Sequence, residues 1–265
     1  MEVTEVLGYF GALTIGIVLG LIGGGGSILT VPVFVYLMHI NPVTATAYSL
    51  FVVGSSALVG AVSNLRKGLI SFRTAIIFSI PAFIAVYLTR KFLVPIIPNE
   101  LFSIVDFTIT KDIGIMAFFA IIMLMASISM IKNRKETTEK EETVSYNYPL
   151  IVIEGIVVGT LTGIVGAGGG FLIIPALVLF ARLPMKKAVA TSLLIIAIKS
   201  LIGFLGDIGN LAIDWSFLIV FTGISIIGIF IGMYLSNFIE GEKLKKGFGW
   251  FVLGMGIYIL IKELT

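Results

Sequence analysis

One glycine-rich motif occurs twice in the chain, and a constant offset separates the two copies. Residues 23–32 (GGGGSILTVP) return 143 positions later as residues 166–175 (GAGGGFLIIP). The same offset aligns further identical residues between Gly16 and Gly60 with their counterparts in the second copy. A register held over this length indicates an internal duplication. Duplicated hydrophobic chains are typical of secondary transporters, in which the substrate site lies between the two halves.

Composition places most of the chain in lipid. Hydrophobic residues make up 58% and charged residues 12% of the 265 residues, whereas charged residues make up about 25% of soluble domains. A soluble chain of this size has too little interior to bury so much apolar surface. Lys and Arg form short clusters between apolar segments, which argues against a nucleic-acid-binding face. The absence of cysteine excludes disulfides, and a single histidine gives no basis for a metal centre or another cofactor.

The apolar runs predict ten segments, five in each copy. We therefore expect an all-α integral membrane protein with about 8–10 membrane segments. Residues 1–131 form a first membrane repeat, 132–148 a charged linker and 149–265 a second membrane repeat, with an exposed loop expected at 93–112. The predicted segments are 5–22, 25–38, 43–64, 74–92 and 113–131, then 149–165, 168–181, 187–206, 216–239 and 248–264.

The basic residues predict how these segments are oriented. Most of them fall in four connections, and cytoplasmic loops of membrane proteins carry the excess of Lys and Arg. Placing these connections in the cytoplasm leaves Arg90, Lys91, Lys111 and Lys262 outside. Both termini are then extracytoplasmic and the linker is cytoplasmic, so each repeat crosses the cell membrane an odd number of times and the two repeats are inverted. The clustered residues are Arg66, Lys67, Arg73, Lys132, Arg134, Lys135, Lys140, Arg182, Lys186, Lys187, Lys243, Lys245 and Lys246.

The first two segments of each repeat predict a hairpin with a glycine-rich apex. The second segment of each pair spans about 21 Å at 1.5 Å per residue, which is short for a hydrocarbon core of about 30 Å. We therefore expect the chain to reverse inside the membrane, with both apices near the midplane. Consecutive glycines expose backbone N–H groups, and the following helix N-terminus is partly positive. Two such ends can bind an anion; the candidate residues are Gly24, Gly25, Gly26, Ser27, Gly168, Gly169 and Gly170.

Close helix packing is the alternative explanation for these glycines. Gly16 and Gly20, with their counterparts Gly159 and Gly163, fit the small-x-x-x-small pattern, and for these four we expect packing. For the consecutive glycines at the apices we expect a role in forming the site.

Lys199 is the single residue that most strongly suggests an anion. It lies about 18 Å along its predicted helix, near mid-bilayer, where a lysine costs about 2.5–3.5 kcal/mol on insertion scales. Such a side chain should face a cavity or a partner rather than lipid. Ser192 lies on the same helical face, and Ser49 is its counterpart in the first repeat. Alternatively, Lys199 snorkels or pairs with Asp207 or Glu154.

Four further polar residues are weaker candidates. Thr46 and Thr191 could donate hydroxyls to an anion, although local bonds to the backbone are at least as well expected. Asn64 and Asp207 occupy counterpart positions at helix ends, where capping is the default role and gating or coupling the alternative. His39, in a short outer turn, is expected at the surface rather than in a proton relay.

Two further stretches make the chain recognisable. ATAYSL (45–50) follows the first glycine apex and its proline, and AVATSL (188–193) follows the second. With them, the chain resembles the sulfite exporter TauE/SafE family over nearly its whole length. The resemblance implies a permease for small anions, with sulfite, sulfoacetate and other sulfur-containing organic anions as substrates.

The sequence thus predicts a secondary transporter that exports a small sulfur-containing anion by alternating access, using an ion or proton gradient. A passive anion channel or an uptake permease would use the same site. We expect neither an ATP-driven pump, since no G-x-x-x-x-G-K-[ST] motif occurs, nor an enzyme, since there is no Ser/His pair, H-E-x-x-H motif or close intramembrane carboxylate pair. The expected partners are the anion and the lipid bilayer, with no nucleic acid and with a homodimer left open.

Overall fold

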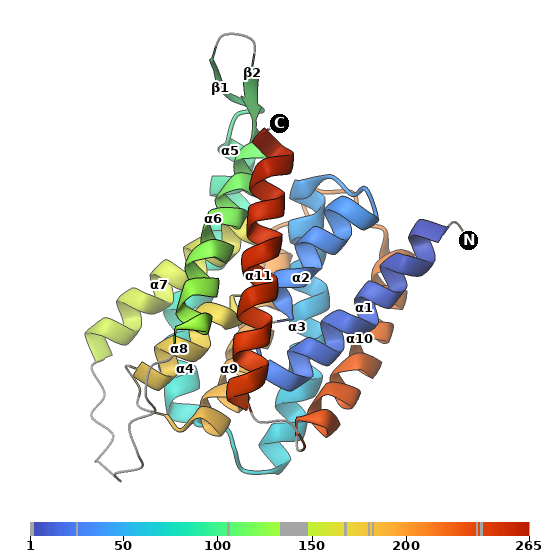
Figure 1. The fold of residues 1–265 in the computed structure, drawn as a ribbon. Coiled ribbons are helices and arrows are strands. Elements are labelled where there is room, and N and C mark those ends of the chain that lie inside the picture. The colour runs from blue at the N-terminus through green and yellow to red at the C-terminus, as the bar shows by residue number, and fades with distance from the viewer. Residues whose placement is uncertain are drawn as a thin grey trace.

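Helices make up most of the computed structural model, which describes residues 3–24, 26–104, 107–132, 148–166, 169–179, 181, 183–236, 238 and 241–264 (Figure 1). The elements are α1 (Val3–Ile22), α2 (Ser27–Pro32), the π-helix η1 (Val33–Leu37), α3 (Pro42–Arg66), α4 (Phe72–Leu88), the π-helix η2 (Thr89–Leu93), α5 (Val94–Ile96), β1 (Glu100–Ile104), β2 (Phe107–Thr110), α6 (Lys111–Ile131), α7 (Tyr148–Val165), α8 (Gly170–Leu179), α9 (Met185–Leu205), α10 (Trp215–Leu235) and α11 (Gly241–Leu264).

The helices occupy the predicted segments, with two departures. Helix α11 begins earlier than expected, because the polar stretch 241–247 contains good helix formers and continues into the apolar run. Residues 93–112, expected to form a loop, contain α5 and an antiparallel hairpin of β1 and β2. The hairpin sequence is rich in β-branched and aromatic residues, which favour strands. Most of the predicted linker, at 133–147, lies outside the described residues.

Several helices suit a lipid environment. Five stretches among the described residues are long and apolar enough to cross a membrane. On α4, Ile76, Ile80, Ile84 and Leu88 are all exposed, and their spacing of four residues places them in one stripe. Such a stripe is unfavourable in water and favourable against lipid chains, so the chain is a multi-pass helical membrane protein. The five stretches are Pro42–Arg66, Phe72–Ile96, Lys111–Ile128, Lys186–Leu205 and Trp215–Leu235.

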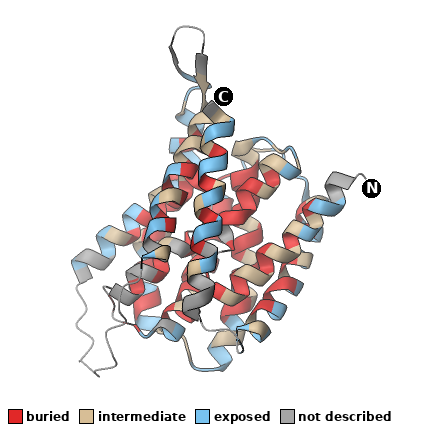
Figure 2. Ribbon diagram, viewed as in Figure 1, coloured by how far each residue is buried: buried red, intermediate tan, exposed pale blue. Residues whose placement is uncertain are grey.

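The centre of the bundle is formed by α3 and α9, which pack against each other (Figure 2). In the most apolar 18-residue stretch of each helix, 72% of the residues of α3 and 67% of those of α9 are buried. The same share is 39–44% in the other three candidate membrane spans. Around this pair, α1 packs on α10, α7 on α4, and α6 on α11. Each of these four pairings joins a helix of the first copy to a helix of the second. The two copies therefore share one interior.

Glycines set the spacing of the outer pairs. Gly16 and Gly20 on α1 lie directly against the backbone of α10, where a side chain on Gly20 would sit 2.8 Å from the amide nitrogen of Met233. Gly159 and Gly163 on α7 lie equally close to α4 and the start of η2. The packing interpretation of these four glycines is confirmed.

The contact at Gly20 predicts that any side chain there separates α1 from α10. Gly20→Ala should lower the free energy of unfolding by about 1–3 kcal/mol, the usual cost of overpacking. The measurement is the thermal unfolding midpoint of the protein in detergent. Gly223→Ala on α10 is the matched control, because nothing lies within 4 Å of a side chain built there. Equal midpoints for the two variants would contradict the prediction.

Candidate functional site

The two glycine apices start with the same backbone geometry. Gly23 and Gly166 are repeat counterparts, and both adopt the left-handed conformation, with φ of 78° and 71°. The amide of Gly23 donates to the carbonyl of Leu19, and the amide of Gly166 donates to that of Thr162, each at 2.8 Å. A left-handed glycine after the last helical turn ends a helix. Helices α1 and α7 therefore stop at equivalent points. After each of them the backbone turns and enters a short helix.

The two apices touch each other. A side chain built on Gly24 would lie 2.6 Å from the carbonyl carbon of Gly170, and one on Gly170 would meet the Cα of Gly24. Helices α2 and α8 begin beside this contact. The predicted residues Gly25 and Gly168 lie outside the described residues. The apices are thus in backbone contact through their neighbours, at a spacing that only glycine allows.

The central helices hold the apices crosswise. Val189 on α9 packs on Gly23, and Ser192 one turn later donates its hydroxyl to the Gly23 carbonyl at 3.1 Å. On the other side, Gly166 packs on Thr46 of α3. Each apex is therefore positioned by the central helix of the other copy.

Lys199 points at the second apex. Its side chain is fully buried, and its ammonium donates to the hydroxyl of Thr162 at 2.8 Å. A side chain built on Gly169 would lie 2.7 Å from the Lys199 nitrogen. Among the described residues no carboxylate lies within 4.0 Å of this nitrogen. Neither snorkelling nor pairing with Asp207 or Glu154 is therefore observed, and the buried Lys199 side chain lies beside the glycines that precede α8.

Arg90 forms an ion pair that the sequence did not suggest. The positive-inside count assigned it to the outer side, near the end of the predicted segment 74–92; it is fully buried in η2, where its Nε donates to Asp207 at 2.7 Å. Asp207 follows the C-terminal end of α9. Burial raises the pKa of Asp207, and the neighbouring Arg90 charge opposes that rise. The partners stand 117 residues apart in the sequence, so no local pattern could have joined them.

The remaining candidate side chains make mostly structural bonds. Thr191 accepts a hydrogen bond from the amide of Ser71 at 3.0 Å, and Asn64 donates to the carbonyl of Gly60 at 2.9 Å. Ser49 is fully buried and its hydroxyl has no partner among the described residues. His39 is exposed, as expected.

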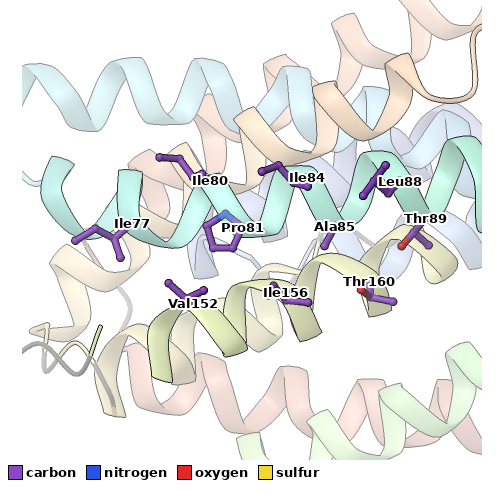
Figure 3. A pocket seen from close by; sticks show the side chains of 10 residues that line it. All are labelled: Ile77, Ile80, Pro81, Ile84, Ala85, Leu88, Thr89, Val152, Ile156 and Thr160. Carbon is purple, nitrogen blue, oxygen red and sulfur yellow. The ribbon is translucent and has the colours of Figure 1, made fainter. Parts of the chain in front are cut away.

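A large groove lies elsewhere, between α4 and α7 (Figure 3). It encloses about 700 Å³, and its wall is apolar except for Thr89 and Thr160. It contains no charged side chain and none of the apex residues, so it does not contribute to the candidate anion site. Its lining is Ile77, Ile80, Pro81, Ile84, Ala85, Leu88, Thr89, Val152, Ile156 and Thr160.

Comparison with known proteins agrees with the resemblance seen in the motifs. The model of the family described as "Sulfite exporter TauE/SafE" matches residues 9–259, nearly the whole chain. The chain belongs to the sulfite exporter TauE/SafE family. It is a membrane transporter of that family by this match, and its apices and central helices all fall within the matched region.

Two relatives of this TauE/SafE protein have names that describe them as probable transporters. A "Probable membrane transporter protein" of Xylella fastidiosa (strain 9a5c) is 29% identical over 251 residues, covering 93% of this chain and 91% of the relative. The "Probable membrane transporter protein YdhB" of Bacillus subtilis (strain 168) is 27% identical over 232 residues, covering 88% and 90%. No solved structure matches the chain significantly.

Proposed function

We propose that this protein is a secondary transporter that exports a small sulfur-containing anion, such as sulfite or sulfoacetate, across the cell membrane. The observation that carries the proposal is the buried ammonium of Lys199 beside Gly169, which no carboxylate of the described residues neutralises. A buried charge is costly unless an opposite charge compensates it. A transported anion supplies that charge while it is bound. The name of the family supports the choice of sulfite.

The apex geometry supports an anion rather than a cation or a neutral substrate. Helix α8 has its N-terminal end at Gly170, next to the Lys199 contact on Gly169. The first-turn amides of a helix are unpaired donors and carry partial positive charge. Together with the ammonium, they form a donor set for an oxyanion. The site residues proposed beside Lys199 are Gly24, Gly25, Gly26, Ser27, Thr46, Ser49, Gly168, Gly169, Gly170, Thr191 and Ser192, with Asn64 and Asp207 assigned to gating or coupling.

Alternating access between two inverted repeats is the proposed mechanism. The exchange of helix partners between copies, α1 with α10 and α7 with α4, is what a two-fold relation between the repeats would produce. Because Gly24 and Gly170 are in contact, the path between the faces is closed at this point. Transport then requires the two apices to separate, first toward one side and then toward the other.

Counterflow distinguishes a carrier from a channel. Proteoliposomes preloaded with unlabelled sulfite should accumulate labelled sulfite above its equilibrium level, because a carrier couples the two movements. The same measurement with vesicles preloaded with sulfoacetate, thiosulfate, sulfate or acetate ranks these anions by how much labelled sulfite each one exchanges. Passive equilibration without accumulation would identify a channel, and no uptake of any of these anions would reject the proposed function.

Lys199 should contribute to binding and not to folding. Lys199→Met keeps the length of the side chain and removes a buried charge, so the thermal midpoint should stay equal or rise. Sulfite affinity should fall about ten- to a hundredfold, as expected for losing one charge-assisted hydrogen bond. Lys199→Arg should retain part of the affinity. The measurement is sulfite binding to purified protein by calorimetry; an unchanged affinity in a stable Met variant would remove Lys199 from the site.

The proposed topology places both termini outside and the 132–148 linker in the cytoplasm. Since the chain has no cysteine, single introduced cysteines report location directly. Lys140→Cys should resist a membrane-impermeant thiol reagent added to whole cells, and Asn99→Cys, the control near the hairpin, should react. Labelling of the linker cysteine from outside would reject the inverted arrangement.

A further inference from the structure

Arg90 is held by three hydrogen bonds that use only part of its guanidinium. Nε donates to Asp207 at 2.7 Å, and Nη1 donates to the Thr46 hydroxyl at 2.9 Å and to the Gly163 carbonyl at 3.1 Å. A guanidinium carries five N–H donors in a rigid plane. These bonds use one donor on Nε and both on Nη1. The two donors of Nη2 are left over, and this atom is buried without a partner among the described residues.

A buried donor on a charged group costs free energy when nothing accepts from it. Such a buried donor is retained in a native structure when a ligand accepts its hydrogen bond. The Arg90 side chain is fully buried and fixed at three points, so the direction of Nη2 is determined by the fold. An N–H donor of a charged guanidinium makes a strong hydrogen bond to an oxygen of a small oxyanion.

The surroundings of Arg90 belong to the second apex. Its partner Gly163 directly follows Thr162, the partner of Lys199. Its partner Thr46 packs on Gly166, where the apex begins. Ser49, with a buried and unpartnered hydroxyl, lies one turn after Thr46 on the same face of α3. Both buried basic side chains therefore bond to residues beside one glycine apex.

We propose that Arg90 is a second cation of the anion site, that it donates from Nη2 to an oxygen of the transported oxyanion, and that Asp207 is a resident carboxylate that weakens this binding. The proposal rests on the anion transport proposed above. Among the guanidinium nitrogens only Nε donates to Asp207, so an anion binds at Nη2 without breaking that bond. The nearby negative charge then repels the bound anion. This repulsion keeps the affinity low enough for the anion to be released. Release takes place on the outer side, because Arg90 lies near the end of the Phe72–Ile96 span that the proposed topology places outside.

Removal of the Asp207 charge gives the sharpest test, because it predicts a gain. Asp207→Asn keeps an oxygen for Nε and removes the repulsion, so sulfite should bind about three- to tenfold more tightly at low salt. Arg90→Lys keeps the charge and loses the fixed donors, so sulfite should bind about tenfold more weakly. In the double variant Arg90→Gln/Asp207→Asn, the gain of the single Asn variant should disappear. Lys91→Gln, at the exposed neighbouring position, should change affinity less than twofold at physiological salt.

Calorimetric titration of each purified variant with sulfite, together with its thermal midpoint without ligand, decides between the outcomes. The double variant has no buried charge at these positions and serves if a single variant is unstable. If Asp207→Asn lowers the midpoint and leaves sulfite affinity equal or weaker, the ion pair is structural and the proposal is overturned. If wild-type affinity depends on Lys199 but on neither Arg90 nor Asp207, this proposal alone is wrong. If wild-type protein binds neither sulfite nor sulfoacetate, thiosulfate, sulfate or acetate, both this proposal and the proposed function are wrong.

Discussion

Backbone contact between the glycine apices is the constraint on which the rest of the fold depends. Gly24 and Gly170 lie so close that no side chain fits at either position. For these two turns to meet, α1 and α7 must stop at equivalent points, and left-handed Gly23 and Gly166 stop them. The helices α2 and α8 that follow are too short to cross a membrane. Their positions therefore depend on their packing against the long central helices α3 and α9. The crossed pairing of the outer helices encloses this arrangement.

The charges do not follow the duplication. The counterparts of Lys199, Asp207 and Arg90 at the same offset are Ser56, Asn64 and Met233. At the first of these positions, Ser56 donates to the hydroxyl of Ser225 at 3.0 Å, a neutral bond that needs no ligand. The equal backbone at both apices therefore carries charge at only one of them. A duplicated chain can thus present two apices of similar backbone geometry while its proposed anion site is concentrated at one of them.

Much of this arrangement could be predicted from the sequence because it depends on local patterns. Apolar runs determine where helices form, and an unbroken offset fixes which glycines are counterparts. The burial of Lys199 followed from its depth in one helix. The ion pair of Arg90 could not be predicted in this way, because counting basic residues assigns each one to a side of the membrane and gives no partner for it. Its partner Asp207 follows α9 in the other copy, and only the packed structure brings the two together. The β1–β2 hairpin was not predicted because its strands, of five and four residues, are shorter than an apolar run of helical length.

The buried charges also explain why a closed apex contact is compatible with transport. In the proposed mechanism, two buried groups make the empty site less stable than the filled one: the Lys199 ammonium, which has no carboxylate partner among the described residues, and the unpartnered Nη2 of Arg90. The proposed substrate anion lowers the free energy of the site when it enters, and the same anion must later leave. The contact between Gly24 and Gly170 opposes neither the entry nor the release of the anion strongly. No side chains interlock there, and a small displacement breaks few contacts. A weakly held backbone contact beside strongly polar side chains is therefore suited to open when the charge balance changes.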